Sequence, residues 1–558
     1  MKLDQEIIKV EILVIGGGLA GCMAAIRASE VCGSENVLLV EKANVQRSGN
    51  AATGVDHTWS YMPEYHEPLG FTVEQLVEDH VQAMGNLQDR DIINTIATTI
   101  KDRLMDMETW GFPVRTDGEW NYVKKIHRVP TFLHWAGRDQ KVLFARQMAK
   151  RNIPVLNRVV IADLIREKNR VAGAVGVGVR ESKFYTILAK STVMTTGGIA
   201  RLFPGPTSWE FNRATHPQCT GDGVAMAYRA GAEISGMEFL YLHTGPKNFH
   251  KKGRGSWIGI TEDAHGVPIG RVSEGVDRKK ISISVESPGD MRRIYEEGRG
   301  PVLMNCSETP DEDMDYMKWA LMNEGNVALL RYLEERKMDP KKYRVEFSVY
   351  EPELRAGIMI DTKGASSLPG LFAAGDTIGN IKRGVSPGAF AMGWLAGESA
   401  ADHAKDESFG ELKNVRDAIG EKRALFDTFL TRETGASWRE ALVACQDTMK
   451  GYGGSVRYAS LLRAGLAQMQ RVRRNAMDSL KAKDLHELMH CISALNLMHV
   501  GESSMLCALE RKESRKTLRE NFIRVDYPEE NREMDKMLIL SLIDGKPFFQ
   551  WRDPRPVS

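Results

Sequence analysis

One arginine, Arg383, stands directly before a small, apolar, glycine-punctuated segment. The stretch is GNIKRGVSPGAFAMG, residues 379–393, and its continuation to residue 401 predicts a largely buried helix. Arginine carries a permanent charge on a planar fork that binds a carboxylate or a phosphate through two hydrogen bonds. We therefore predict that Arg383 holds an anionic substrate. The alternative is a structural arginine that pairs with a buried acid.

A glycine pattern at the other end of the chain has the chemistry of a nucleotide site. In VEILVIGGGLAGCMAAIRASE, Gly16, Gly18 and Gly21 have the GxGxxG spacing between a β-branched apolar run and an alanine-rich run. Such glycines permit a tight turn, the approach of a pyrophosphate and close packing of helix on strand. Glu41 ends the next predicted strand, NVLLVEK, where a carboxylate can accept a ribose hydroxyl. The pattern predicts a dinucleotide site and leaves FAD or NAD open.

The composition excludes several classes of protein. The 558 residues exceed what one hydrophobic core supports, so two to four domains are expected. Lys and Arg (75) nearly balance Asp and Glu (74), which argues against a nucleic-acid partner. No apolar run is long enough to span a membrane and the first residues do not read as a signal peptide, so we expect a cytoplasmic protein. The seven cysteines are scattered, which predicts reduced thiols and no metal or iron-sulfur site in this chain.

Several longer motifs carry a resemblance to one protein family. GGGLAG with VEK, QRSGNAATG, RVVIADLI, MTTGG, THPQCTGDGVAMAYRAGAEISGMEFLYLHTG, LPGLFAAGD, the 379–393 segment and RKESRKTLRENFIRVDYP follow one another along the chain. Their order resembles that of the flavoprotein subunits of succinate dehydrogenase and fumarate reductase, together with the related adenylylsulfate reductase alpha subunit. The likeness spans nearly the whole chain, and it implies that the nucleotide is FAD.

The resemblance also implies which residues contact FAD. Asp376 would bind the ribityl or pyrophosphate part, and the backbone of Val159 and Val160 would bind the adenine. Asp222 starts a predicted helix, where a carboxylate can cap free N–H groups, and it is also a flavin-proximal candidate. The other expected contacts follow the same motifs: Lys42, Ser48, Gly49, Ala51, Thr53, Gly54, Thr196, Gly197, Gly198, Ser386, Gly388, Ala389 and Phe390.

The mode of FAD attachment depends on one position in QRSGNAATG. In succinate dehydrogenase this stretch contains the histidine that bonds covalently to the flavin, and Gly49 takes the matching position here. His57 comes eight residues later and is out of register. We therefore predict noncovalent FAD.

Candidate substrate residues also follow from the resemblance. An arginine in the loop of Arg383 binds a substrate carboxylate in succinate dehydrogenase and fumarate reductase, whereas adenylylsulfate reductase has a histidine near this point. His243 falls where the dicarboxylate enzymes have a substrate-binding histidine, although the proline that follows theirs is missing. Arg355 and Arg254 are candidates to complete an anion clamp or to deliver a proton, with surface placement as the alternative. Asn248 replaces an arginine expected of adenylylsulfate reductase, while RGPVLMN, residues 299–305, resembles that subfamily.

These patterns predict an α/β fold with four segments. An FAD-binding, Rossmann-like domain with two dinucleotide folds comprises residues 1–245 and 346–405, and an inserted α+β capping domain comprises residues 246–345. Residues 406–558 are expected to form a helical domain with an irregular charged tail. The basic run RKESRKTLRENFIR is expected to be a solvated helix face, with contact to a partner as the alternative.

The sequence is compatible with three functions. The first is an FAD-dependent oxidoreductase subunit of the fumarate reductase or succinate dehydrogenase type, which exchanges electrons at flavin N5 between a small anionic substrate and a separate iron-sulfur subunit. The second is an adenylylsulfate reductase alpha-like subunit. The third, from another class, is a noncatalytic electron-transfer flavoprotein subunit of a redox complex.

Overall fold

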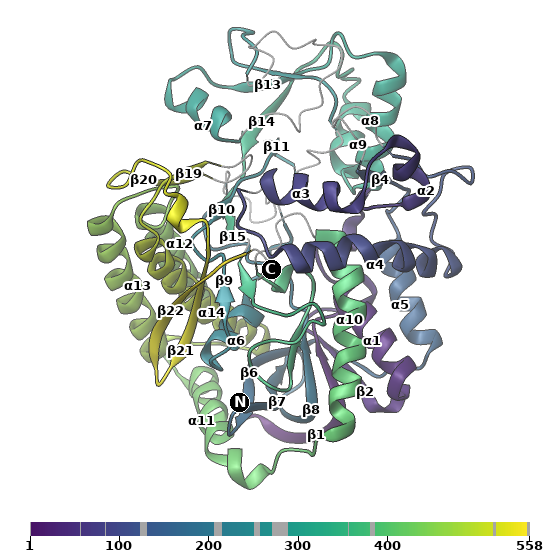
Figure 1. Cartoon of the computed structure of the whole chain (residues 1–558). Helices are drawn as coiled ribbons and strands as arrows, with labels where there is room; N and C mark the ends of the chain where they lie inside the picture. The colour runs from purple at the N-terminus through teal and green to yellow at the C-terminus, as the bar shows by residue number, and fades with distance from the viewer. Residues whose placement is uncertain are drawn as a thin grey trace.

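The computed structural model describes most of the chain (Figure 1). The described residues are 2–55, 57–83, 85–122, 131–205, 215–249, 257–269, 288–354, 356–379, 385–516 and 521–554.

The central sheet is built around β1 (Asp4–Ile15), whose end ILVI is buried. The strand order is β5 (Val155–Asn157), β2 (Val37–Glu41), β1, β8 (Lys183–Met194), β7 (Arg170–Gly178) and β6 (Val159–Glu167). β5, β2, β1 and β8 are parallel, whereas β7 and β6 are antiparallel to their neighbours. β17 (Leu371–Ala373) also pairs in parallel with β8, so a late segment of the chain completes the sheet begun by the N-terminus. This arrangement confirms the expected α/β fold.

Helix α10 (Val385–Asp406), predicted from the apolar run after Arg383, packs against the nucleotide helix α1 (Leu19–Cys32). Glycines allow this approach: a Cβ on Gly393 would lie 2.7 Å from the carbonyl oxygen of Ala20, and one on Gly397 would lie 2.8 Å from Ala24 Cα. The two segments singled out by sequence are therefore neighbours. The same side of the molecule also holds the remaining elements of the first 150 residues (Figure 1). They are α2 (Pro63–His66), α3 (Val73–Ala83), α4 (Arg90–Thr109), α5 (Gln140–Lys150) and the strand pair β3 (His57–Trp59) and β4 (Phe132–His134).

The inserted segment forms a separate sheet at the top of Figure 1. Its order is β11 (Thr244–Pro246), β14 (Val345–Val349), β13 (Val302–Asn305) and β12 (Ile260–Glu262), all antiparallel. α7 (Pro288–Glu296), α8 (Asp311–Asn323) and α9 (Val327–Glu335) accompany this sheet. The insert has its own apolar core, in which Trp257, Met304 and Phe347 are fully buried. We call residues 244–349 the capping unit.

Two short strand pairs lie where the chain leaves for the capping unit and returns from it. β9 (Ile234–Ser235) pairs with β16 (Gly357–Ile358), and β10 (Leu240–Tyr241) pairs with β15 (Glu353–Leu354). Both pairs are antiparallel. They hold the two connections side by side at the base of the capping unit.

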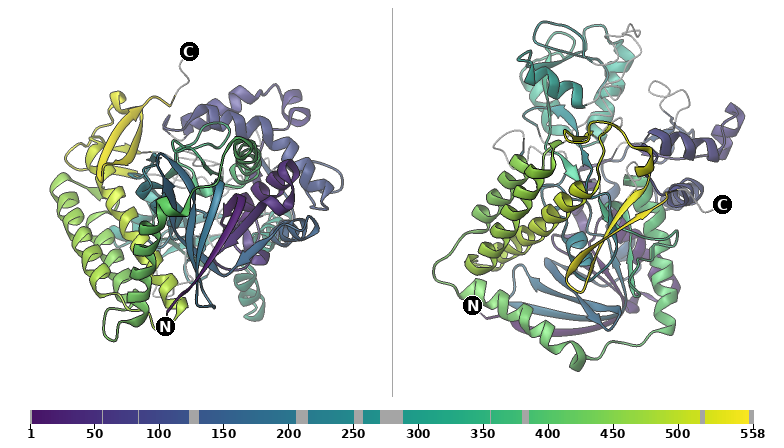
Figure 2. Two further views of the ribbon diagram at one scale, coloured as in Figure 1. Left: turned by 90° about the horizontal axis from the view of Figure 1, so that it is seen from below. Right: turned by 60° about the vertical axis from the view of Figure 1, so that its left-hand side comes forward.

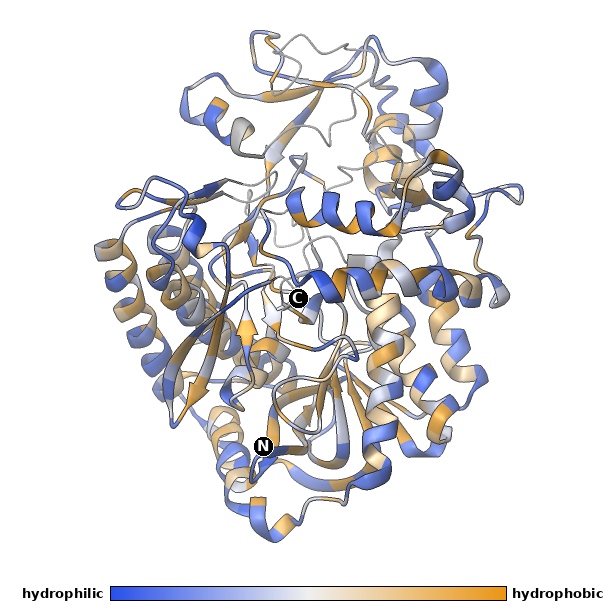
Figure 3. Cartoon of the chain, in the orientation of Figure 1, coloured by the Kyte–Doolittle hydropathy of each residue, from blue (hydrophilic) through white to orange (hydrophobic). Residues whose placement is uncertain are grey.

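The expected C-terminal helices are α11 (Leu412–Thr431), α12 (Trp438–Tyr452), α13 (Ala459–Ser479) and α14 (Leu485–Glu510), with α6 (Asp222–Arg229) beside α14. Figure 2 shows them gathered along one side of the central sheet. Figure 3 shows hydrophilic residues on the outer helices and hydrophobic ones along the strands, as burial requires. None of the helices in the described ranges is long and apolar enough to cross a membrane.

The expectation of an irregular tail is wrong. β21 (Met537–Ile543) and β22 (Lys546–Arg552) form an antiparallel hairpin, and β21 also pairs with β9. The turn consists of Asp544 (φ 49°) and Gly545 (φ 73°), and this left-handed conformation at both positions suits an Asp-Gly turn whose twist matches the strands. The charged residues before the hairpin predict an irregular tail, although the Asp544–Gly545 pair is typical of a hairpin turn.

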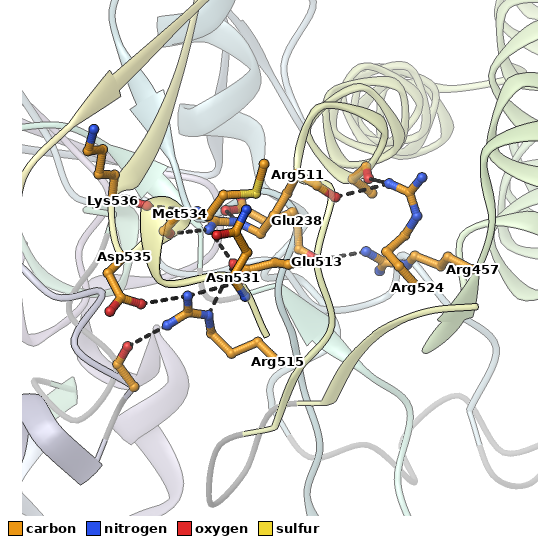
Figure 4. Close-up of polar contacts among 12 residues, drawn as sticks. Glu238, Arg457, Arg511, Glu513, Arg515, Arg524, Asn531, Met534, Asp535 and Lys536 are labelled. Carbon is orange, nitrogen blue, oxygen red and sulfur yellow. Dashed lines mark hydrogen bonds and ion pairs between the residues drawn. The ribbon is translucent and has the colours of Figure 1, made fainter. Parts of the chain in front are cut away.

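The expectation of a solvated basic helix face is also wrong. Arg511 and Arg524 are at most 1% exposed, Arg515 of β19 (Arg515–Lys516) is 2% exposed, and the run crosses a small sheet with β20 (Asn521–Arg524) and β18 (Val456–Arg457). Figure 4 shows Arg511 and Arg515 converging on the buried carboxylate of Glu513. Arg511 also pairs with Glu238, 2.9 Å away and 273 residues earlier. The nearby Glu513 and the distant Glu238 together make this burial possible.

Candidate functional site

The glycine loop between β1 and α1 has the geometry that the sequence predicts. Gly16 has φ +103°, and its N–H donates to the carbonyl of Val40 at 2.8 Å. A Cβ on Gly21 would overlap the carbonyl of Gly16, so the helix can pack on the turn only with glycine there. Thr195, after β8, donates from Oγ1 to the carbonyl of Gly16 at 2.8 Å and holds the turn from the other side.

Glu41 lies at the end of β2 with 7% of its surface exposed. Its carboxylate accepts hydrogen bonds from the N–H of Gly17 and of Ala43, each at 2.6 Å. Each oxygen keeps acceptor capacity, so the group can also accept a ribose hydroxyl. Val160 is buried in β6, at the end of the strand order, and pairs with Val177 of β7.

A cradle of small residues faces the glycine loop. Gly49 has φ +84°, and a Cβ on it would lie 2.9 Å from Gly18 Cα. Ser48 is buried and donates from Oγ to the carbonyl of Gly17 at 2.9 Å. A short 3-10 turn, Asn50–Thr53, contains Ala51 and leads to Gly54. Only glycine leaves room for a flat or phosphate-bearing group where these segments approach.

Asp222 does not have the capping role that the sequence suggested. Gly221 occupies the N-cap of α6 and no side chain caps the helix. The Asp222 carboxylate instead pairs with Lys42 Nζ at 2.8 Å and accepts from Asn496 Nδ2 at 2.8 Å and from Thr220 Oγ1 at 2.9 Å. Burial opposes ionisation, but Lys42 and these hydrogen bonds outweigh it and lower the pKa of Asp222. Lys42 and Asp222 therefore form an ion pair that holds the start of α6 against the end of β2.

The MTTGG segment and Asp376 meet at the end of β8. Gly197 N–H donates to Thr377 Oγ1 at 2.9 Å, and Gly223 N–H donates to Thr196 Oγ1 at 3.1 Å. A Cβ on Gly198 would lie 3.6 Å from Asp376 Cβ. These residues, far apart in sequence, line one region beside the glycine loop.

The first turns of α10 contain the predicted contacts Ser386, Gly388, Ala389 and Phe390. Ser386 is 8% exposed, and a Cβ on Gly388 would lie 3.7 Å from Ile96 Cδ1. The Phe390 ring stacks on Phe144, with ring centroids 5.9 Å apart and planes 8° apart. Its ring therefore packs in the core, which leaves its backbone for any contact with a cofactor.

Sequence reasoning missed two buried residues at the start of α5, beside the turn of residues 50–53. Gln140 is fully buried, and neither amide atom has a hydrogen-bond partner in the described part of the protein. Lys141 is also fully buried, hydrogen bonds to the carbonyl of Val45, and lies with Nζ 3.4 Å from Cys22 Sγ. An orphaned amide and a buried cation suit a polar, anionic ligand such as a dinucleotide. No motif marks either residue in the sequence.

His243 lies between β10 and β11, where the chain passes from the FAD-binding part to the capping unit. It is 3% exposed, and its Nε2 lies 3.2 Å from Oε2 of Glu353, which is 4% exposed. Its ring meets Tyr241 edge-on, with centroids 4.5 Å apart. Glu353 thus orients the imidazole. Arg383, Arg355 and Arg254 lie outside the described residues.

The cradle of Gly16, Gly18 and Gly49, the acceptor Glu41 and the buried polar groups of Gln140 and Lys141 fit an FAD dinucleotide. Comparison with known proteins agrees. Residues 11–267 match the FAD binding domain family, and residues 443–553 match the fumarate reductase flavoprotein C-terminal family.

Relatives extend over nearly the whole chain. A CoM/CoB fumarate reductase subunit of Methanothermobacter marburgensis is 24% identical and covers 97% of this chain and 98% of its own. The fumarate reductase flavoprotein subunit of Escherichia coli is 24% identical and covers 92% of this chain and 88% of its own. The structure of adenylylsulfate reductase from Archaeoglobus fulgidus superposes with a TM-score of 0.85 at 23% identity, covering 98% of this chain and 96% of that one.

The fold and the site define a flavoprotein oxidoreductase that depends on FAD. The chain contains an FAD binding domain and a fumarate reductase flavoprotein C-terminal domain, and it is similar to fumarate reductase flavoprotein subunits along nearly its whole length.

Proposed function

We propose that this chain is a catalytic flavoprotein subunit that transfers electrons between an iron-sulfur partner and a small anionic substrate. Relatives that cover 92–97% of the chain are named fumarate reductase subunits, which supports both the reaction type and a separate partner chain. The observation that carries the proposal is the buried His243–Glu353 pair at the base of the capping unit. A polar pair at this junction is placed to meet a substrate enclosed between the two parts.

FAD, when bound, exchanges an electron pair with the substrate at its N5 position. The chain itself has three tasks around that step. Arg383 holds the substrate anion, as its type and place in the sequence suggest. His243, oriented by Glu353, donates a hydrogen bond to the substrate or moves a proton. The start of α10 supplies positive dipole potential beside the cofactor.

The capping unit excludes water from the substrate in this proposal. Its helix α8 reaches the flavin loop directly, because a Cβ on Gly54 would overlap the carbonyl of Asn323. The unit thus rests against residues 53 and 54, which are expected to contact the flavin.

A rapid-mixing experiment tests the proposal. The purified, reduced holoprotein is mixed with fumarate, with other enoates or with adenylylsulfate, and flavin absorbance is followed. Reoxidation by an enoate supports the proposed reaction, and reoxidation by adenylylsulfate alone would assign the chain to the alpha-like subunits instead. No reoxidation by any of them would leave a noncatalytic electron-transfer subunit.

Arg383 is tested by Arg383→Ala, with Lys382→Ala as the neighbouring control. We expect Arg383→Ala to abolish turnover while FAD stays bound, and Lys382→Ala to turn over normally. Unchanged kinetics in Arg383→Ala would make Arg383 a structural residue.

A further inference from the structure

The capping unit and the flavin loop meet through two reciprocal glycine contacts. Gly54 (φ +122°) lies against the Asn323 carbonyl at the end of α8, and Gly325 (φ +93°) lies against Thr53. A Cβ on Gly325 would lie 2.9 Å from Thr53 Cβ and would overlap its carbonyl. The turn between α8 and α9 is therefore seated directly on the loop expected to contact the flavin.

Asn326 follows Gly325 in this turn and is 1% exposed. Its backbone is satisfied, because its N–H donates to the Leu321 carbonyl at 2.9 Å and its carbonyl accepts from Leu330 N–H at 3.2 Å. Its side chain is not: within the described residues, neither Oδ1 nor Nδ2 has a hydrogen-bond partner. Asn326 holds the N-cap position of α9 without capping the helix, so the usual reason for asparagine there does not apply.

Asn323, the last residue of α8, provides the comparison three residues earlier. It is 9% exposed, and its Nδ2 donates to the Trp319 carbonyl at 2.9 Å. Helix α8 thus supplies a hydrogen-bond partner for the amide of Asn323, whereas the amide of Asn326 has none among the described residues. A buried amide without a partner destabilises a fold unless another group supplies its hydrogen bonds.

We propose that Asn326 is a substrate-binding and specificity-determining residue supplied by the capping unit. Its Nδ2–H group donates to a carboxylate or sulfonyl-type oxygen of the anionic substrate lying over residues 53 and 54. This assignment rests on the proposed function and extends it. Because the residue belongs to the capping unit, its bond to the substrate also favours closure of that unit over the site.

The test compares Asn326→Leu with Asn323→Leu, since leucine has similar volume and no polar atoms. Fumarate and adenylylsulfate are titrated into the oxidised holoprotein, where neither can be reduced, and the Kd is read from the flavin difference spectrum. Thermal unfolding of the FAD-free proteins is measured in parallel. We expect Asn326→Leu to raise the Kd of the bound substrate at least tenfold, to keep FAD and to raise the unfolding midpoint. Asn323→Leu should lower the midpoint and change the Kd less than twofold.

A second variant, Asn326→Asp, keeps the side-chain size and faces the anion with a carboxylate, so it should weaken binding further than leucine. A wild-type Kd in Asn326→Leu would overturn the assignment, as would loss of FAD from that variant, since Asn326 would then support the cofactor and not the substrate. A wild-type holoprotein that binds neither ligand and is reoxidised by none would instead remove the proposed function.

Discussion

Replacing Glu513 by Gln tests whether the buried arginines of the C-terminal segment depend on that one carboxylate. Glu513 is 0% exposed. Its Oε1 accepts from Arg511 at 2.8 Å and Arg515 at 3.1 Å, and its Oε2 accepts from Arg515 and from the N–H of Asn531, each at 3.0 Å. Glutamine keeps the volume, removes the charge and turns one acceptor into a donor that faces other donors.

The expected cost follows from the burial of both arginines. Removing one partner of a buried ion pair typically costs about 3–5 kcal/mol, because the remaining charge stays desolvated. With an unfolding entropy of about 2.1 cal/mol/K per residue over the whole chain, this loss corresponds to a fall in midpoint of about 3–4 °C. A segment that unfolds separately would show a larger fall.

Scanning calorimetry of the FAD-loaded protein at pH 7 measures this effect. Glu530→Gln is the matched control, because Glu530 is 58% exposed and lies 3.4 Å from the same Arg515. An exposed pair contributes about 0–1 kcal/mol, so the control should fall by less than about 1 °C. Equal shifts in the two variants would refute the reasoning that burial makes Glu513 indispensable.

Three further predictions concern the cofactor and the helical region. Gly49→Ala should weaken FAD binding about tenfold or more, because the new Cβ would lie 2.9 Å from Gly18 Cα. Gly118 has a similar φ of +83° and open space around it, so Gly118→Ala should retain FAD. Fluorescence titration measures both affinities. Precipitation with trichloroacetic acid should release all flavin to the supernatant, and a yellow pellet would contradict noncovalent binding. Burial and nearby cations lower the pKa of His490, stacked on Trp438, to about 3. The unfolded chain therefore binds a proton below about pH 6.5 that the folded protein excludes, so stability falls as pH falls from there toward 3, by about 2 kcal/mol at pH 5. Burial also lowers the pKa of His499 to about 3, so this residue adds a similar loss. His490→Phe should therefore reduce the slope by about half in denaturant titrations between pH 7 and 5, and an unchanged slope would show that His490 does not contribute.

Local patterns predicted the nucleotide loop well, because its constraints are local. Gly16 has a positive φ, and a Cβ on Gly21 would overlap the carbonyl of Gly16 five residues earlier, so their spacing alone indicates the turn. The Asp544–Gly545 turn was equally local, yet the charged stretch before it led to the wrong expectation of an irregular tail.

Long-range partners account for the other errors. A helix-capping rule predicted the wrong role for Asp222, since Lys42 and Asn496, 180 and 274 residues away, bind its carboxylate. A local window predicts a solvated helix face for the basic run, but the run crosses a small sheet, and Glu513 and the distant Glu238 pair with its buried arginines.

The sequence by itself determined an α/β fold with a dinucleotide site, because glycine spacing and strand–turn–helix order are properties of neighbouring residues. The order of its longer motifs then implied that the dinucleotide is FAD. Only the tertiary structure decided which buried polar groups find partners. It paired His243 with Glu353 and left the amides of Gln140 and Asn326 unpaired within the described part of the chain. Whether a buried group is satisfied depends on atoms that folding brings from distant parts of the chain, so no local pattern can report it.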